Sequence, residues 1–387
     1  MEPTPPFISL PRLFLRFLRF GFLAWGGPVA QIGLIKHELV DRERWITIDY
    51  FNRTLAVYQM LPGPEAAELC VFFGHQRRGR IGGLLAGLGF MLPGFLLMLG
   101  LSWLYVTYGL EAALFGALFY GLKPAVAALV GLAVVRIART ALSDPWLIGI
   151  ALGAFLATAL GRVSFVLVLA ASGAAYLVVK SGRLDALWPG RSAFLFALPL
   201  GLPVVALSLP ELVPFFWSGL KGGLLTFGGA YTLIPILQQD GVYENGWLTN
   251  PQYLDGLALG GILPAPLVIF STFVGYVGGG LPGSLALSLG IWIPAFSFTL
   301  IGHRWLERLV HHPRWQVFLA GMTAGVVGLI AAAALDLGGA ALVDGPTVAL
   351  AVLAAGILVR WPSGVGILAG VLVPGAVGAA AKLLVIG

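Results

Sequence analysis

Residues 15–68 read LRFLRFGFLAWGGPVAQIGLIKHELVDRERWITIDYFNRTLAVYQMLPGPEAAE, and much of this stretch occurs a second time 202 positions later. Without any gap, Gly26-Gly27 falls on Gly228-Gly229, and Leu61-Pro62 falls on Leu263-Pro264. Such similarity at a fixed spacing indicates an internal duplication. Each copy carries two helix-breaking points inside apolar sequence. These four points are where we expect the function.

The composition excludes a water-soluble globule. Of the 387 residues, 58% are hydrophobic and only 10% are charged, whereas a soluble domain carries about 25% charged residues. The apolar runs reach the roughly 20 residues that a membrane-crossing helix needs. The 54 glycines and 25 prolines are tolerated in membrane helices, where they permit close packing and broken segments. We therefore expect an all-α, multi-pass protein of the cell (inner) membrane, surrounded by the lipid bilayer.

The residue types also argue against several other classes of protein. The single cysteine, Cys70, excludes an intramolecular disulfide and a thiolate metal cluster. The sequence has no phosphate-binding loop and no His/Asp/Ser cluster at catalytic spacing. We expect no enzyme, no cofactor and no metal site. The basic residues that give the net charge of +6 lie at the ends of apolar segments and are not interleaved with aromatic residues. They therefore do not predict nucleic-acid binding.

The apolar segments divide the chain into two homologous halves. Residues 1–193 form the N-terminal half, 194–210 an unpaired connecting transmembrane segment, and 211–387 the C-terminal half. The predicted spans are 13–36, 54–74, 81–107, 111–139, 146–160 and 163–179, then 194–209, then 214–238, 253–277, 282–302, 315–335, 345–359 and 363–385.

The distribution of Lys and Arg predicts how these halves face the membrane. In the first half, the chain start, the 36–53 loop and the 75–80 loop are all basic. They share one side only if the first two segments are re-entrant hairpins rather than full crossings, and the positive-inside rule favours the hairpins. In the second half the 238–253 loop has no Lys or Arg, whereas the loop around 302–314 is basic. The second half is thus predicted to be inverted, as in many secondary transporters.

The four breaks are predicted to form a pocket for a small oxyanion. Irregular backbone at membrane depth must face protein or water, and the half-helix that follows each break offers unpaired N–H groups that attract anions. The alternative is that these residues only permit close packing. The candidate substrate-binding residues at the breaks are Gly26, Gly27, Pro28, Pro62, Gly63 and Pro64, with their second-half equivalents Gly228, Gly229, Ala230, Pro264, Ala265 and Pro266.

Charged and amide side chains near the breaks extend this site. Lys123 and Lys221 lie within apolar segments, where a cation usually faces a partner or a cavity, so we expect both to compensate substrate charge. Gln31, Gln59 and Gln238 are candidate hydrogen-bonding residues near the breaks. Arg19 aligns with Lys221 in the repeat, and snorkelling to the membrane surface is the competing interpretation for Arg19.

Two acids follow the second break. Glu65 and Glu68 lie three residues apart on the half-helix that starts after Pro64, and the second half has Leu267 and Phe270 in their places. A carboxyl group in apolar surroundings can be loaded with and relieved of a proton, so both are candidates for proton coupling. Complementing the helix N-terminus is the alternative role.

At these residues the sequence resembles the chromate ion transporter family, in its long, two-domain form. The resemblance rests on FGFLAWGGP at 20–28, HELV at 37–40 followed by Trp45, LPGPE at 61–65, GLKPAV at 121–126, TFGGAY at 226–231, GWLT at 246–249 and GLALGGILPAPL at 256–267. One departure is Ala265, where the family's commonest pattern has glycine.

The resemblance implies a secondary transporter that exports chromate, coupled to protons, and that confers chromate resistance. Alternatives from the residues remain open: an uptake or exchange carrier for sulfate or another small anion, or a membrane scaffold without flux. The repeat is compatible with a homodimer, but the chain already holds both halves.

Overall fold

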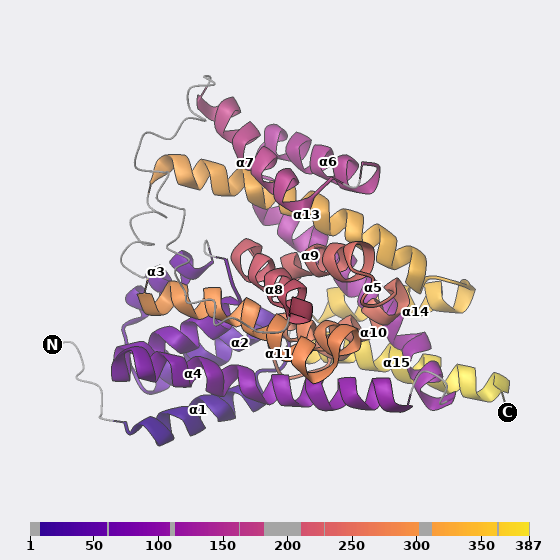
Figure 1. Cartoon of the computed structure of the whole chain (residues 1–387), viewed down its shortest axis with the longest axis horizontal. Helices are drawn as coiled ribbons and strands as arrows, with labels where there is room; N and C mark the ends of the chain where they lie inside the picture. Colours follow the sequence, from indigo (N-terminus) through magenta and orange to yellow (C-terminus); the bar gives the residue numbers. More distant parts are fainter. Residues whose placement is uncertain are drawn as a thin grey trace.

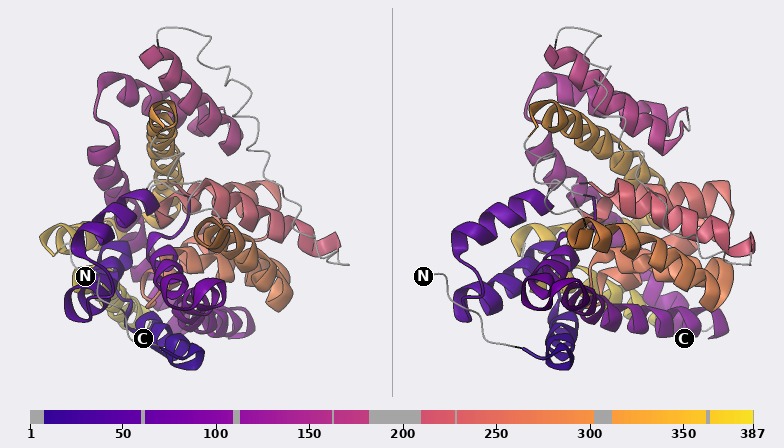
Figure 2. Two further views of the ribbon diagram at one scale, coloured as in Figure 1. Left: turned by 90° about the vertical axis from the view of Figure 1, so that its left-hand side faces the viewer. Right: turned by 60° about the vertical axis from the view of Figure 1, so that its left-hand side comes forward.

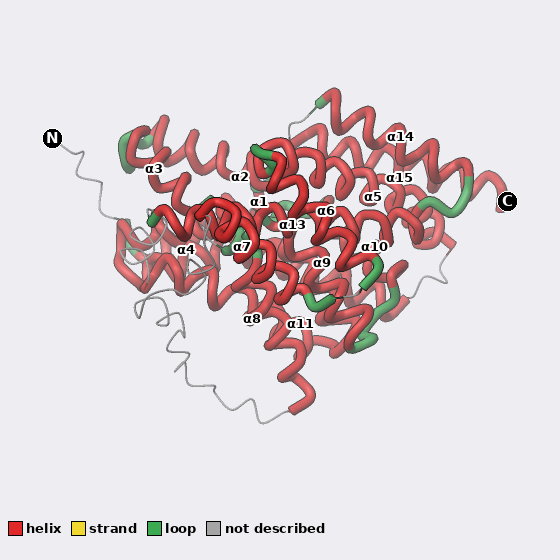
Figure 3. The backbone as a smooth tube through the Cα atoms, turned by 90° about the horizontal axis from the view of Figure 1, so that it is seen from above, coloured by secondary structure: helices red, strands yellow, loops and turns green. Residues whose placement is uncertain are grey.

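The computed structural model describes residues 8–59, 62–108, 113–161, 163–181, 210–227, 229–301, 312–361 and 364–386. The predicted connecting segment and Gly228 lie outside the described residues. Within the described residues the regular structure is helical throughout, with no strand (Figure 3).

The first half follows the apolar pattern closely. Its helices are α1 Leu10–Leu23, α2 Gly27–Ile35, the π-helix η1 Lys36–Arg42, α3 Ile48–Tyr58, α4 Glu65–Tyr108, α5 Ala113–Ala141, α6 Pro145–Ala159 and α7 Phe165–Ser181.

The second half repeats this order. Its helices are η4 Pro210–Leu212, α8 Val213–Leu225, η5 Ala230–Thr232, α9 Leu233–Gln238, the π-helix η6 Gln239–Glu244, α10 Asn250–Gly261, η7 Leu267–Ile269, α11 Phe270–Ile301, α13 Pro313–Ala341, α14 Gly345–Arg360 and α15 Gly364–Ile386. Even the π-helical turns recur, since both halves carry one just before the loop that contains the repeated tryptophan.

The long helices α4 and α11 each contain a sharp turn. Arg78 and Gly79 leave the helical region, with φ +59° at Gly79, and Gly279 and Gly280 do the same, with φ +61° at Gly280. The two limbs then pack side by side, because a Cβ on Gly275 would lie 2.6 Å from the carbonyl oxygen of Gly283. Glycine is needed both for the left-handed turn and for this close approach.

The chain also doubles back at the first break. Arg16, in α1, bonds Glu43 beyond the end of η1, and its guanidinium lies 5.1 Å from the ring centre of Trp45. Arg77, at the end of the first limb of α4, lies 4.0 Å from the same ring. The first-half hairpins are α1 with α2, and α3 with the first limb of α4. Their ends remote from the breaks therefore meet at Trp45. In the second half Phe215 stacks on Trp247, with ring centres 4.1 Å apart.

The homologous second limbs of α4 and α11 cross in opposite directions. A Cβ on Gly83 would lie 2.6 Å from Leu300, and one on Gly87 would lie 2.8 Å from Phe296. Further along, Phe95 meets Trp292 with ring centres 5.4 Å apart. As the residue number rises along α4 it falls along α11.

The remaining helices exchange partners between the halves. Helices α14 and α15 of the second half pack on α5, whereas α6 and α7 of the first half pack on α13 (Figures 1 and 2). Helices α5 and α13 also run in opposite directions, since Tyr120 near the start of α5 donates a 2.8 Å hydrogen bond to Asp344, just past the end of α13. At the other end of α5, Arg136 donates to the carbonyl oxygen of Leu358 at 3.2 Å.

The helices of the described chain fall into two sets. The hairpin body comprises α1–α4 and α8–α11 with their π- and 3-10 turns, and the scaffold comprises α5–α7 and α13–α15. Helix α10 contacts α5, α13 and α15 across the boundary between the two, and α9 contacts α13.

The surface of the molecule matches lipid rather than water. Five helices of the described residues are long and apolar enough to cross a membrane. Large apolar side chains point outward along the scaffold, among them Trp146 at 61% exposure and Val352 at 67%. Because such a surface is unfavourable in water, the chain is an all-α polytopic membrane protein, as its composition predicts.

Candidate functional site

The first break separates α1 from α2. Gly26 and Gly27 take φ values of +93° and +78°, a conformation that suits glycine, and Pro28 lies in the first turn of α2. The buried side chain of Gln31 donates 3.1 Å to the carbonyl oxygen of Ala24 at the end of α1, while its own amide oxygen has no hydrogen-bond partner. The break is therefore polar inside.

The second break separates α3 from α4. Pro62, Gly63 and Pro64 are buried, Gly63 has φ +146°, and α4 begins at Glu65. Gln59 lies at the exposed end of α3. Helix α3 ends at Tyr58, before this motif, and α4 begins directly after it.

The second-half breaks differ in detail from those of the first half. After Gly229, whose φ is +106°, the chain makes a 3-10 turn that begins at Ala230 before α9 starts. After the buried Pro264, Ala265 and Pro266 another 3-10 turn precedes α11. The first-half breaks lead directly into α-helix, whereas the second-half breaks lead first into a 3-10 turn.

The structure brings the second and third breaks together. The backbone N–H of Gly63 donates 2.9 Å to the carbonyl oxygen of Thr226. The carboxylate of Glu65 faces the third break, since a Cβ on Gly229 would lie 4.0 Å from its Oε1. The fourth break packs against α4, where Ala265 meets Gly94, and the first break packs against Ile367 of α15. The second and third motifs thus lie against each other, the fourth against α4 and the first against α15, and the 3-10 turns η5 and η7 that follow the third and fourth breaks are also in contact.

Glu68 is enclosed at the second break. Its side chain is fully buried, and neither carboxyl oxygen has a hydrogen-bond partner. Its Oε1 covers Gly63, where a Cβ would lie only 2.6 Å away. An ionised carboxylate without a donor or a cation costs several kcal/mol in such a place, so the geometry suits a carboxyl that carries a proton.

Lys123 does not stand alone in the scaffold. Its ammonium lies 3.2 Å from Oδ1 of Asp255 on α10, and the Asp255 side chain is fully buried. Tyr105, on the second limb of α4, donates 2.8 Å to the other carboxylate oxygen. The cation that the sequence assigns to substrate is therefore paired with a carboxylate of the chain itself.

Lys221 is paired in the same way. It donates 2.8 Å to Oδ1 of Asp240 in the π-helix η6, and the Asp240 side chain is 5% exposed. This ion pair links α8 to η6, the two limbs on either side of the third break. Sequence reasoning overlooked Asp255 and placed Asp240 in a loop. The rule that singled out Lys123, a charge within an apolar segment, would have found Asp255 as well.

The charged cluster at Trp45 lies outside the membrane-spanning segments. Glu43 accepts hydrogen bonds from Arg16 and from the indole nitrogen of Trp45, the latter at 2.8 Å. Burial by itself raises the pKa of Glu43, but these hydrogen bonds and the charges of Arg16 and Arg42 outweigh it, and the pKa lies below its usual value. Glu43 is thus held as an anion at the end of the first hairpin that is remote from the break.

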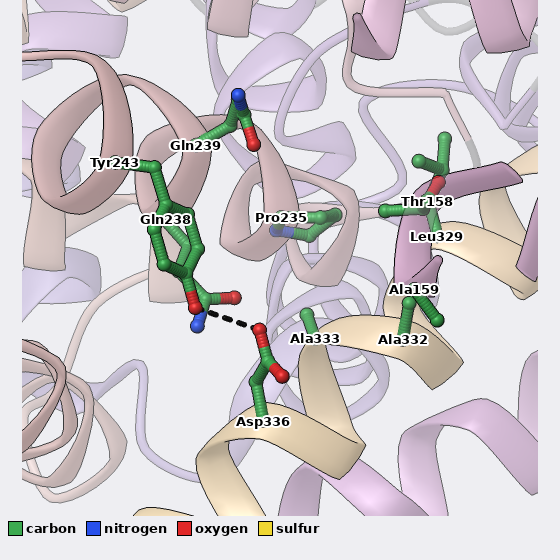
Figure 4. Close-up of a pocket in the computed structure, with 10 residues that line it drawn as sticks. All are labelled: Thr158, Ala159, Pro235, Gln238, Gln239, Tyr243, Leu329, Ala332, Ala333 and Asp336. Carbon is green, nitrogen blue, oxygen red and sulfur yellow. Dashed lines mark hydrogen bonds between the residues drawn. The ribbon is translucent and has the colours of Figure 1, made fainter. Parts of the chain in front are cut away.

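A cavity of about 130 Å³ lies between the hairpin body and the scaffold (Figure 4). It is far larger than one water molecule needs. Tyr243 donates 2.7 Å to Asp336 across it. It is lined by Thr158, Ala159, Pro235, Gln238, Gln239, Tyr243, Leu329, Ala332, Ala333 and Asp336. Gln238, one of the candidate hydrogen-bonding residues, is among them. Among the described residues no group of three or more His, Cys, Asp or Glu side chains could hold a metal ion.

Comparison with known proteins accounts for both halves of this arrangement. The family described as chromate transporter matches residues 11–177 and again residues 213–380. The chain is 49% identical to a chromate transport protein of Pseudomonas aeruginosa, over 97% of this chain and 94% of that protein. It is 30% identical to a chromate transport protein of Cupriavidus metallidurans, over 92% of this chain and 90% of that protein.

A probable chromate transport protein of Synechococcus elongatus is also 30% identical, over 93% of this chain and 92% of its own length. No solved structure matches this chain. The relatives are named as transport proteins and not as enzymes. With two copies of the family's sequence pattern and near full-length similarity to its members, this chain belongs to the chromate transporter family.

Proposed function

We propose that this chain is a secondary active transporter that exports chromate, coupled to protons, by alternating access. The names of its relatives support chromate as the substrate. The geometry of the breaks supports the mechanism, because the breaks combine helix ends that can bind an anion with a carboxyl group that can carry a proton.

Alternating access needs two related halves that exchange roles, and an inverted repeat supplies them. The opposite directions of α4 and α11, and of α5 and α13, support an inverted repeat. So does the reciprocal packing of α14 and α15 on α5 and of α6 and α7 on α13. We propose that the hairpins with breaks at Gly26-Gly27 and at Pro62-Gly63-Pro64 are re-entrant from one membrane face, and that their second-half equivalents enter from the other.

The oxyanion would bind where the second and third breaks meet. The N-terminus of α4 would supply the N–H groups of its first two residues, since those of Ala67 and Glu68 already bond the carbonyl oxygen of Pro64. At the third break Gly229 has no side chain to cover the backbone. The N-terminus of α2 at Gly27 and Pro28 would serve as a second donor group, with Gln31 beside it. Aimed N–H groups and the helix dipole favour a dianion.

The two lysines would compensate charge at longer range. Each is already paired with a carboxylate, Lys123 with Asp255 and Lys221 with Asp240. Release from these carboxylates would make either cation available to the dianion. Gln59 and the residues of the fourth break remain proposed lining residues.

Glu68 carries the proposal of proton coupling. Its carboxyl lies at the second break, enclosed and without a donor, and Glu65 next to it faces the third break. A proton on Glu68 would lower the negative charge at the break and favour the oxyanion, and loss of that proton would favour its release. Proton and anion would then travel through one site.

The test is chromate flux in vesicles that contain the purified chain. An imposed pH gradient should drive accumulation of chromate, and Glu68→Gln should abolish the response to the gradient while the protein remains folded. Glu211→Gln, an exposed acid in η4, is the matched control. Absence of chromate flux in the unaltered protein would refute the proposed function. Stronger flux of sulfate than of chromate would favour the alternative carrier.

We further propose that the protein lies in the cytoplasmic membrane with Trp45 and the basic turn at Arg78 inside, following the positive-inside rule. A homodimer is compatible with this arrangement. The molecular mass of the purified complex in detergent decides between monomer and dimer.

A further inference from the structure

Two polar links join the hairpin body to the scaffold within the part of the chain that the structure describes. One is the buried ion pair of Lys123, on the scaffold, with Asp255, on the hairpin body. The other is the hydrogen bond from Tyr243, on the hairpin body, to Asp336, on the scaffold. Both cross the same boundary, and the cavity of about 130 Å³ lies along it.

Stability alone is a weak reason for the Lys123–Asp255 pair. Removing two charges from water costs several kcal/mol per ion, and their attraction repays this only with good geometry and further hydrogen bonds. Here Tyr105 supplies one such bond, but Oδ1 of Asp255 accepts no well-aligned hydrogen bond. Well-packed apolar residues would hold the two bodies together at least as firmly. A buried pair that can be broken is better suited to two alternative arrangements.

The position of the pair connects it to the breaks. Asp255 lies on α10, which leads directly into the fourth break at Pro264. Lys123 lies on α5 within a turn of Gly121, where α5 approaches the backbone of α15 so closely that a Cβ would overlap it. A movement of α10 relative to α5 would therefore shift a break against the scaffold.

The packing of the two bodies is uneven along their boundary. On the hairpin side of the cavity Pro235, Gln238 and Tyr243 leave space, whereas within each body the helices approach to backbone contact at glycines such as Gly219 and Gly321. Close packing resists displacement. Around the cavity, where α9 and η6 face α6 and α13, displacement is less hindered than at these glycines.

We propose that the hairpin body moves against the scaffold during transport, and that Asp255 is a positioning residue that holds Lys123 in one of the two arrangements. This inference rests on the proposed transport function and extends it, because it names the carboxylate that competes with the anion for Lys123. Asp255 acts through Lys123 and need not touch the substrate.

The first test reverses the charges of the pair. Asp255→Asn and Lys123→Met should each lower chromate flux about tenfold or more. Each substitution leaves a buried charge unpaired and removes the contact that holds one of the two arrangements. The swapped variant Lys123→Asp/Asp255→Lys forms the pair again but leaves no cation on α5 for the anion. It should therefore restore the amount of folded protein and not the flux. Recovery of flux in the swapped variant would overturn the competition between Asp255 and the anion for Lys123. Full flux in both single variants would overturn the positioning role of Asp255 as well.

The second test locks the boundary. In a Cys70→Ala background, Tyr243→Cys/Asp336→Cys should transport until a short cleavable dithiol reagent joins the two cysteines, and cleavage should restore flux. The matched control is Asp144→Cys/Lys180→Cys, a 3.1 Å ion pair within the scaffold, whose joining should leave flux unchanged. Undiminished flux in the locked boundary variant would overturn the movement. The unlocked background separately tests the proposed function, since it must transport chromate.

Discussion

At the scale of single residues, Lys123 and Lys221 stand out in the sequence because a charge in an apolar helix needs a partner. In the structure each has one, a carboxylate from a different helix. Neither lysine is therefore an unpaired cation in this structure. The role assigned to each must be tested together with its carboxylate.

Lys221→Ala should abolish chromate flux and leave Asp240 buried without its cation. Removing one partner of a buried pair costs about 3–5 kcal/mol, and less here because the Lys221 side chain is 25% exposed. Loss of flux could then follow from misfolding alone. The double variant Lys221→Ala/Asp240→Asn removes both charges and should restore the amount of protein in the membrane but not the flux. Recovery of flux in the double variant would exclude a direct role of Lys221 toward the anion.

Glu43 provides a pH-dependent test of the ion pair with Arg16, at the end of the first hairpin that is remote from the break. Its pKa in the folded chain lies below the usual 4.5, so the unfolded chain binds the proton more readily. The stability that Glu43 contributes is present above pH 4.5 and is lost as the pH falls through the lowered pKa. The melting temperature of Glu43→Gln in detergent should lie below that of the unaltered protein near neutral pH, and the difference should shrink in acid. A constant difference across this range would contradict the ion-pair account.

At the scale of helices, the sequence predicts the breaks well. Gly26-Gly27-Pro28 and Pro62-Gly63-Pro64 interrupt helices as their backbone preferences require, and the apolar pattern predicts helices on both sides. Local chemistry decides such features, and local chemistry is visible in the sequence. The contacts between one break and another cannot be predicted in the same way. The contact of Gly63 with Thr226 depends on how two halves cross, and no local pattern carries that information.

The turn within α11 separates two reasons for which glycine is used. Gly280 has φ +61°, but a Cβ there would meet only the ring of Pro282, at 3.9 Å. With ψ −154°, Gly280 lies in a backbone region that is essentially restricted to glycine, so Gly280→Ala should cost about 1–3 kcal/mol through backbone strain. Gly275 is helical, but a Cβ there would lie 2.6 Å from the carbonyl oxygen of Gly283.

Gly275→Ala must therefore push the two limbs apart and disturb the packing of α8 against α11. We expect a larger loss of thermal stability from Gly275→Ala than from Gly280→Ala, and loss of flux only in Gly275→Ala. Melting curves and flux measured on the same preparations check the order. Equal effects of the two substitutions would argue against close packing of the limbs.

At the scale of the whole molecule, the two halves differ in charge at corresponding places. The first half holds Arg16, Arg77 and Arg78, whereas the positions 202 residues later hold the neutral Ser218, Gly279 and Gly280, and Glu244 stands in the place of Arg42. Scaffold contacts place the region of Glu244 near Asp336, at the same end as Asp344 and the start of α5. An inverted repeat in a membrane with a basic inner side accounts for this difference, since one region then faces the cytoplasm and the other faces outward.

This arrangement predicts which cysteines a membrane-impermeant maleimide can reach in intact cells. In a Cys70→Ala background, Asn245→Cys should react from outside, because Asn245 is exposed at the outer end of η6. Arg42→Cys, at a side chain that is 70% exposed, should react only after the membrane is permeabilised. The two positions lie in equivalent loops of the repeat, so each serves as the control for the other's accessibility. Labelling of both from the same side would mean that the halves are parallel, and the proposed exchange of roles between them would lose its structural basis.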